Sequence, residues 1–401
     1  MIHKCFAISL SALALLAIGV GAQDADSASV EDRLKKLEQE LQSLRQENQQ
    51  LRQELGVPVV VVKPAGPEKE IKLGGYVQAQ AEFGDPGDAR WTLTPDGRAS
   101  KAENDRFYLR RARINLAGSF LEHFNFRIEG EFAGSLGEAS GMRAQLTDGW
   151  ANWNRFDFAQ VRAGQFFPVF GWEKRLSPTL LQSVEYSLAG DRLLPDRQLG
   201  VQLWGQFLEK RLGYALGAFN GNNLNNNWND NDNFMMVPRL EGVPLQGKVL
   251  GWDAKWALGL SAYYSDDTTF RLPPEINTNL FTGQRTAAGF DTQLQFGPFD
   301  LWAEYLFTEC DPDVGSTLDA QGWYVLLGYY VVPKKLQALV KYEQFDPNTD
   351  VSGDATDTWT LGASYALRGD NLKLYLNYLL MDVPGQEEWE QKVLMRLQAV
   401  F

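Results

Sequence analysis

The stretch FNFRIEGEF, residues 124–132, alternates between apolar and polar side chains along its length. Its apolar side chains share one face of an extended chain: Phe124, Phe126, Ile128 and Phe132. Its polar side chains share the other face: Asn125, Arg127, Glu129 and Glu131. The stretch LKLYLNY, residues 372–378, has the same period. A period of two predicts β-strands whose two faces meet different environments.

This period predominates from residue 71 to residue 401 and predicts sixteen strands. The predicted strands cover residues 71–83, 105–118, 123–133, 143–154, 158–166, 198–208, 212–220, 233–243, 251–266, 287–297, 299–309, 321–332, 335–345, 357–368, 371–382 and 389–401. Their even number and their length suit strands that cross a bilayer with a tilt. A soluble β-sandwich would alternate in the same way, so the period alone leaves both folds open.

The connections between the predicted strands favour the membrane barrel. Connections after even-numbered strands are short: residues 121–123, 155–157, 209–211, 298, 333–334 and 369–370. Connections after odd-numbered strands are mostly long: residues 84–104, 167–197, 221–232, 267–286, 310–320 and 346–356. Short periplasmic turns and long outer loops are typical of outer-membrane barrels. We therefore expect an all-β, 16-stranded antiparallel transmembrane barrel over residues 71–401, with both of its ends on the short-turn side.

Two further features of the barrel segment agree with this fold. The chain ends VLMRLQAVF, residues 393–401, and a terminal Phe401 after an alternating strand resembles the signal read by outer-membrane assembly machinery. The 23 Phe, 14 Tyr and 12 Trp residues of the chain often lie near the ends of the alternating segments, as an interfacial aromatic girdle requires.

The first 22 residues resemble a secretory signal peptide. Lys4 precedes an apolar run, and small residues follow it at the expected cleavage site before Gln23. The alternative, a membrane anchor, would need a longer span of about 20 apolar residues. No later segment approaches 18 consecutive apolar residues, so helical membrane spans are not expected.

Residues 23–56 are predicted to form an α-helical coiled coil ahead of the barrel. Leucine or valine recurs at the core positions of heptads, with one asparagine: Val30, Leu34, Leu37, Leu41, Leu44, Asn48, Leu51 and Leu55. The flanking positions of a parallel pair are complementary in charge: Arg33 with Glu38, Glu40 with Arg45, and Glu47 with Arg52. This pattern predicts self-association in the periplasm. Residues 57–70 are expected to be an extended linker.

Charge and rare residues exclude several function classes. The net charge of −13 argues against a nucleic-acid partner. Beyond the leader the chain holds one cysteine, Cys310, and one histidine, His123. A disulfide within the chain and a His-rich metal site are therefore not expected. His123 falls in a predicted turn without a serine or aspartate constellation around it, so we expect no enzyme, no catalytic residue and no cofactor.

Five motifs in the barrel segment carry a resemblance to a known family. They are Arg110-Arg111-Ala112-Arg113, Leu146-Thr147-Asp148, Arg162-Ala163-Gly164-Gln165-Phe166, Gln198-Leu199-Gly200-Val201-Gln202 and Gly217-Ala218-Phe219-Asn220-Gly221. Over residues 71–401 the chain resembles the phosphate-selective porin O and P family. The resemblance implies a trimeric, 16-stranded porin of a Gram-negative outer membrane that passes anionic solutes. Family members often carry a lysine where this chain has Phe167, so strict phosphate specificity is not expected.

Eight basic residues are the candidate pore-lining, substrate-binding set. Four lie at alternate strand positions whose side chains are expected to face the lumen: Arg111, Arg113, Arg127 and Arg162. Four lie in the long third loop: Lys174, Arg175, Arg192 and Arg197. Guanidinium groups bind oxyanions in bidentate fashion, and rings of charge select ions in channels. Alternatively, the strand arginines pair with Glu129, Glu131 and Asp148 and only stiffen the wall. Arg110 is expected at the rim.

The third loop, residues 167–197, is expected to fold into the barrel and narrow it, because a 31-residue loop without obvious structure needs a role. The alternative is that this loop stays outside the barrel and forms an external vestibule. The sequence therefore predicts an outer-membrane porin, a water-filled channel for small solutes with a weak-to-moderate preference for anions. Its expected partners are further copies of itself, outer-membrane lipid and small anions. A non-selective porin and a structural tether between envelope layers remain as other readings.

Overall fold

The computed structural model describes residues 35–36, 38–40, 42–43, 69–92, 105–133 and 144–401. The chain divides into two units, residues 1–61 and 62–401. Within the predicted coiled-coil segment, the described residues 35–36, 38–40 and 42–43 are helical. The rest of that segment, the predicted signal peptide and most of the predicted linker lie outside the described residues. The last two residues of that linker belong to the first strand, which begins at Lys69.

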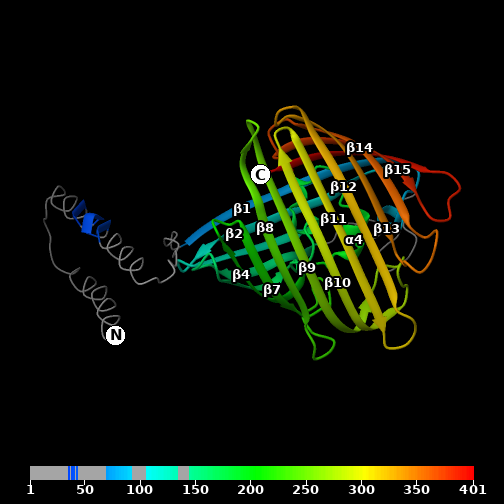
Figure 1. The fold of residues 1–401 in the computed structure, drawn as a ribbon, viewed down its shortest axis with the longest axis horizontal. Helices are drawn as coiled ribbons and strands as arrows, with labels where there is room; N and C mark the ends of the chain where they lie inside the picture. The colour runs from blue at the N-terminus through cyan, green and yellow to red at the C-terminus, as the bar shows by residue number, and fades with distance from the viewer. Residues whose placement is uncertain (1–34, 37, 41, 44–68, 93–104, 134–143) are drawn as a thin grey trace. The chain divides into compact units, whose positions relative to one another are not determined.

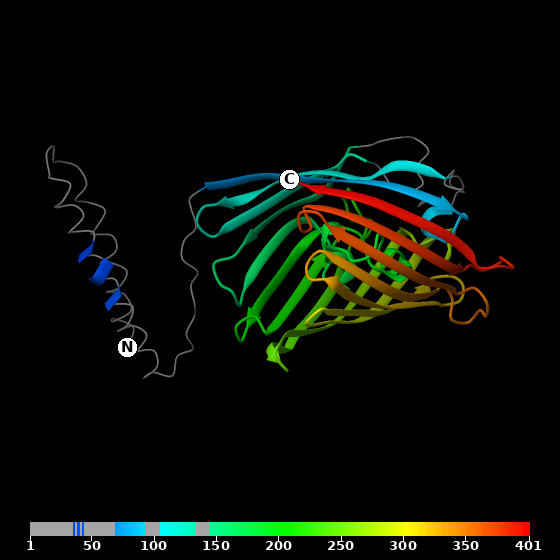
Figure 2. The same cartoon turned by 90° about the horizontal axis from the view of Figure 1, so that it is seen from above.

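The second unit is a closed antiparallel barrel of sixteen strands, in which each strand pairs with its neighbours in the sequence and β1 pairs with β16. The strands are β1 Lys69–Gly84, β2 Arg106–Phe120, β3 Phe124–Glu131, β4 Gln145–Trp153, β5 Gln160–Phe166, β6 Gln198–Phe207, β7 Leu212–Phe219, β8 Met235–Val249, β9 Trp252–Arg271, β10 Leu280–Phe296, β11 Phe299–Pro312, β12 Leu318–Val332, β13 Leu336–Asp346, β14 Thr356–Ala366, β15 Leu372–Asp382 and β16 Glu390–Val400. Figures 1 and 2 show blue β1 lying beside red β16. The sixteen predicted strands are confirmed.

The faces of the strands follow the predicted alternation. On β15 the side chains of Lys373, Tyr375 and Asn377 are buried in the lumen, whereas Leu374 and Leu376 are exposed on the outside. An exposed row of leucines on every second position is stable in lipid and would be costly in water. No helix in the described part of the chain is long and apolar enough to span a membrane.

The predicted bounds were wrong around the fifth long loop. We expected residues 267–286 as loop, but β9 runs to Arg271 and β10 begins at Leu280, with Leu280 opposite Arg271. The loop is therefore only residues 272–279. The physical reason is that apolar residues are sparse here: Asp266, Asp267, Thr268 and Thr269 precede Phe270 and Arg271, so hydrophobic alternation disappears while backbone pairing continues. β8 likewise extends to Val249, beyond the predicted end at residue 243.

The third loop folds into the lumen, as predicted. It contains three short helices, η2 Glu173–Arg175, η3 Pro178–Leu180 and α4 Leu188–Leu193, and α4 contacts β11, β12 and β13 (Figure 1). Phe170 packs edge-to-face on Tyr263 of β9 with ring centroids 4.9 Å apart. Leu188 and Phe345 of β13 belong to the same buried cluster. An apolar core inside the barrel thus holds the loop against one side of the wall.

Phe401 extends the seam between β1 and β16 that closes the barrel. The N–H of Phe401 donates to the carbonyl of Gly75 on β1, and the N–H of Gly75 donates back to the carbonyl of Phe401, both at 3.0 Å. The Phe401 ring also lies against Gly75, where a Cβ would come within 2.9 Å of it. Backbone groups that lose such partners in hydrocarbon cost several kcal/mol each, as an order of magnitude.

Deleting Phe401 is therefore expected to lower the yield of assembled barrel in the outer membrane several-fold. The deletion removes both closing hydrogen bonds and the terminal aromatic side chain. The yield is measured as heat-modifiable protein in outer-membrane fractions. Trp228→Ala removes an exposed aromatic of the fourth long loop and is the matched control. A normal yield of the deletion variant would contradict the closing role of Phe401.

Candidate functional site

A β-bulge places two consecutive arginines of β2 in the lumen. Gln78 of β1 faces Arg111, whereas Ala79 faces Leu109, so Arg110 is an extra residue between them. A bulge shifts the alternation by one residue, and both neighbouring side chains can point to one face. Our expectation that Arg110 lies at the rim was wrong for this reason: a strict period of two does not reveal a bulge.

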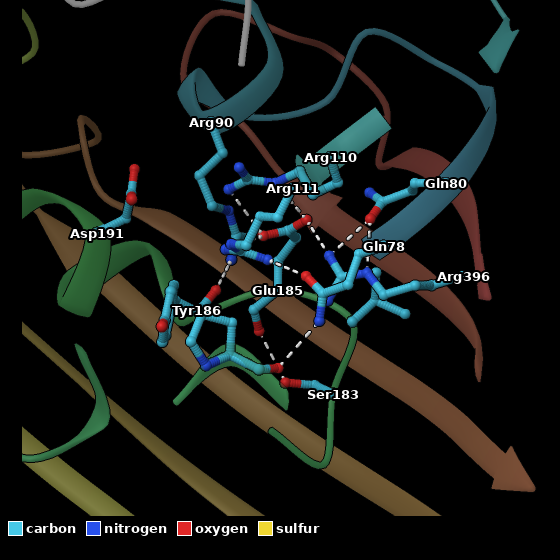
Figure 3. A network of polar contacts seen from close by, with 12 residues as sticks. Gln78, Gln80, Arg90, Arg110, Arg111, Ser183, Glu185, Tyr186, Asp191 and Arg396 are labelled. Atoms are coloured by element: carbon cyan, nitrogen blue, oxygen red, sulfur yellow. Dashed lines mark hydrogen bonds and ion pairs between the residues drawn. The ribbon is translucent and has the colours of Figure 1, made fainter. Parts of the chain in front are cut away.

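Arg110, Arg111 and Arg396 surround one carboxylate of the third loop, Glu185 (Figure 3). Arg110 forms a bidentate pair with it at 2.8 and 3.1 Å, Arg396 lies at 2.6 Å and Arg111 at 3.6 Å. Burial alone would raise the pKa of Glu185, but the three guanidinium charges outweigh burial and hold it well below its usual range. Three cations around one anion leave a surplus of two positive charges.

Other lumen side chains bind the backbone of the third loop. Glu304 on β11 accepts hydrogen bonds from the N–H of Trp172 at 2.6 Å and of Glu173 at 3.2 Å. Asn377 on β15 accepts from the N–H of Val184 at 2.6 Å. Glu304 therefore anchors the loop. Polar residues on distant strands fix the position of the loop.

A cavity of about 430 Å³ lies between the third loop and the strand ends near the long loops; we call it the long-loop cavity. Its basic lining residues are Arg90, Arg110, Arg111, Arg113, Lys174, Arg192, Arg197, Arg271 and Arg285. Its acidic lining residues are Glu131, Asp191 and Asp196. Basic residues thus outnumber acidic ones in the lining, nine to three, although seven of the nine pair with carboxylates. Five of the eight predicted basic residues lie here.

Most of the predicted basic residues have carboxylate partners. Arg113 pairs with Glu129 at 3.1 Å and with Glu131 at 2.7 Å. Further pairs join Arg127 to Glu129 and Asp148, Arg175 to Glu241, Arg192 to Asp191 and Glu275, and Arg197 to Asp148. The wall-stiffening alternative thus has support at Arg113 and Arg127.

Lys174, Arg271 and Arg162 are lumen cations that form no ion pair with a carboxylate in the described parts of the chain. Lys174 donates to the backbone carbonyls of Asp191 and Leu194, at 3.4 and 3.3 Å. Arg271 lines the long-loop cavity at the end of β9. Arg162 packs over aromatic rings instead. These three side chains retain donors that a solute could use.

A second cavity of about 350 Å³ lies near the turn at residues 208–211; we call it the short-turn cavity. Its charged lining residues are Arg127, Arg162, Arg175, Arg239, Asp148 and Glu241. Its aromatic lining residues are Trp150, Phe166, Phe167, Trp204 and Tyr214. Phe167 also lines the long-loop cavity, and Arg197 covers its ring at 4.0 Å. Phe167 therefore stands between the two cavities.

Sequence reasoning missed several basic residues of the lumen. Arg239 and Arg396 share the inward parity of their strands, so the alternation could have identified both. Arg285 was expected in a loop but lies in β10, paired with Asp267. Arg90, in the short helix α3 Ala89–Thr92 of the first loop, pairs with Glu343 at 2.8 Å, and no sequence signal points to this contact.

Comparison with known proteins gives a family and a fold. A family model described as "Phosphate-selective porin O and P" matches residues 93–401. An anion-selective porin from Comamonas acidovorans is similar in structure, with a TM-score of 0.56 at 14% identity over 83% of this chain and 100% of that one. The outer membrane channel DcaP of Acinetobacter baumannii gives 0.58 at 12% identity, over 85% and 100%.

OmpT, an outer membrane protein of Vibrio cholerae solved in a trimer form, gives a TM-score of 0.55 at 12% identity over 84% of this chain and 100% of that one. At such low identities these three structures show the shared barrel fold alone. No curated protein matches the chain by sequence.

Proposed function

The chain belongs to the phosphate-selective porin O and P family, and from this premise we propose that the path through its lumen prefers small anions over cations. The family and the closed 16-stranded barrel are those of an outer-membrane diffusion channel. In such channels a loop that enters the lumen sets the width, and nearby charges set the selectivity. Here the third loop separates two cavities that both contain arginines.

The cationic lining of the long-loop cavity carries the proposal. Its nine basic residues exceed its three acidic ones, and two of the nine, Lys174 and Arg271, form no ion pair with a carboxylate in the described part of the chain. The acidic total charge does not oppose this, because exposed charges are screened beyond about 8 Å at physiological salt. The field in a narrow passage is set by the nearest residues. Because Glu129, Glu131 and Asp148 neutralise part of the wall, the proposed preference is weak to moderate.

Assembly and location form part of the same proposal. We place the barrel in the outer membrane of a Gram-negative cell as a homo-oligomer, with a trimer as the expected form. The trimer form of the similar Vibrio cholerae protein supports this number by analogy. We further propose that residues 23–56 form a parallel coiled coil in the periplasm, supported by the complementary charges at its heptad flanks. The proposal assigns no catalytic residue and no cofactor.

Liposome swelling tests the proposed permeation directly. Liposomes that contain the full-length mature protein are diluted into isotonic solutes of similar size: a neutral sugar, a sugar carboxylate and an amino sugar. We expect the carboxylate to enter fastest and the amino sugar slowest. Equal rates would indicate a non-selective porin. Absence of swelling with folded protein would favour the structural tether.

Deletion of residues 23–56 is expected to leave a folded barrel and to weaken its oligomer. The barrel closes on itself through β1 and β16, and the helical segment belongs to the other unit. Heat-modifiability on gels measures folding, and light scattering in detergent measures the oligomer. If the shortened protein fails to fold where the full-length form folds, the division into two independent parts is wrong.

A further inference from the structure

The short-turn cavity contains a guanidinium group without a polar partner. Within the described part of the chain, the side chain of Arg162 makes no hydrogen bond or ion pair, although the charge of Asp148 acts on it from beyond ion-pair distance. Its Nε atom is buried without a partner. Its guanidinium carbon lies 4.4 Å from the centroid of the Trp150 ring, 5.4 Å from that of Phe166 and 5.6 Å from that of Trp204. A buried donor without an acceptor costs free energy unless a bound molecule supplies that acceptor.

Neighbouring cations of the same cavity are already compensated. Arg127 lies 3.3 Å from Asp148. Arg175 lies 3.0 Å from Glu241, and Arg239 lies 2.7 Å from Asp291. Arg162 is thus the lining cation, among the described residues, that can accept a new carboxylate without breaking an existing ion pair. It is placed on β5 between Asn152 and Gln202 of the flanking strands, neither of which carries charge.

The aromatic rings around Arg162 are held in position. The indole N–H of Trp204 donates to Asn152 Oδ1 at 2.9 Å, and Asn152 Nδ2 donates to Gln160 at 3.2 Å. Phe166 packs edge-to-face on Phe219 with centroids 5.3 Å apart. A flat anion can therefore stack on the rings and pair with the guanidinium group. Because the rings and the cation are already fixed, little side-chain entropy is lost on binding.

From this arrangement we propose that the short-turn cavity is a binding subsite for aromatic carboxylates. The carboxylate takes the free guanidinium edge of Arg162, and the ring of the solute packs on Trp150 and Trp204. This inference rests on the proposed anion path and adds a substrate class to it. An inorganic oxyanion would gain nothing from the indole rings. The volume of about 350 Å³ lies within the range of small-molecule sites.

Benzoate is the probe, and single-channel current in KCl is the measurement. The full-length mature protein is inserted in planar bilayers, and benzoate, acetate or inorganic phosphate is added in increasing concentration. We expect benzoate to reduce the chloride current at a concentration about tenfold lower than acetate or phosphate, because ring stacking adds to the ion pair. Arg162→Gln is expected to raise the half-blocking concentration of benzoate about tenfold.

Two further variants separate the subsite from general effects. Trp204→Leu keeps Arg162 and removes one ring, so it should weaken the benzoate block and leave the acetate block unchanged. Arg155→Gln removes an arginine that covers Phe156 in the turn after β4, outside both cavities, and should leave the benzoate block as in wild type. Heat-modifiability confirms that each variant folds.

Several results would overturn the subsite. The subsite is wrong if benzoate blocks the current no better than acetate does. It is also wrong if phosphate blocks at a lower concentration than benzoate. An Arg162→Gln channel with a wild-type benzoate block would place the binding elsewhere. If such a channel still prefers chloride over potassium, the subsite is wrong but the proposed anion preference is not. A wild-type channel that prefers potassium would refute the proposed function itself.

Discussion

Replacing Glu185 with alanine is expected to raise the single-channel conductance several-fold and to strengthen the preference for anions. Among the described residues, Glu185 is the acid that pairs with both Arg110 and Arg396. Removing one partner from a buried ion pair costs about 3–5 kcal/mol, since it leaves buried charge without compensation. The three arginines would then repel one another, and the middle of the third loop would leave the wall.

The conductance of Glu185→Ala is measured in planar bilayers beside two comparison variants. Glu388→Ala removes the same charge from an exposed position in the eighth long loop and should change nothing. Glu185→Gln keeps the shape and a hydrogen-bond acceptor, so its effect should be intermediate. Folded Glu185→Ala protein with wild-type conductance would show that the loop does not depend on this cluster.

The same cluster sets an expectation for pH. The pKa of Glu185 lies well below its usual range because the surrounding arginines outweigh the effect of burial. A carboxylate with a lowered folded-state pKa contributes stability that is complete above its unfolded pKa and is lost as the pH falls through the folded value. The unfolded pKa of a glutamate is about 4.3. The contribution of Glu185 should therefore persist undiminished from pH 7 to pH 5.

Removing Arg111 and Arg113 together is expected to shift the reversal potential strongly toward cation preference. The double alanine variant subtracts two positive charges and also leaves Glu129 and Glu131 with fewer partners. The carboxylates freed in this way add a negative field beside the path. Removing Lys174 and Arg271, which form no described carboxylate pair, should shift the potential in the same direction by less.

This series is measured as reversal potentials across a KCl gradient, with heat-modifiability as the check on folding. Lys334→Gln with Lys335→Gln removes two exposed charges from a short turn and serves as the matched control. An unchanged reversal potential in the Arg111 and Arg113 variant would mean that these arginines stabilise the barrel wall and do not select ions. The selectivity would then reside in the third loop.

Much of the barrel could be predicted from the sequence, because lipid on one side and water on the other impose alternation on each strand. The stretch at residues 124–132 shows this in full, and its polar side chains do face the lumen. The prediction failed at the ends of the longest strands. At residues 266–271 backbone pairing continues without an apolar face, so no signal of period two remains.

The candidate site could be predicted only in part. The parity rule placed Arg111, Arg113, Arg127 and Arg162 in the lumen, and loop length indicated that the third loop enters it. The contacts of these side chains could not be predicted, because the loop residue Glu185 meets Arg396 across 211 positions of sequence. The bulge at Arg110 depends on backbone register, which a hydrophobic pattern does not encode.

The reversal potential of the wild-type channel across a KCl gradient tests the central proposal most directly. The full-length mature protein is reconstituted in a planar bilayer, with the salt concentration higher on one side. The cationic lining of the long-loop cavity predicts a potential whose sign corresponds to chloride passing more readily than potassium. A potential of the opposite sign would contradict the proposed anion preference.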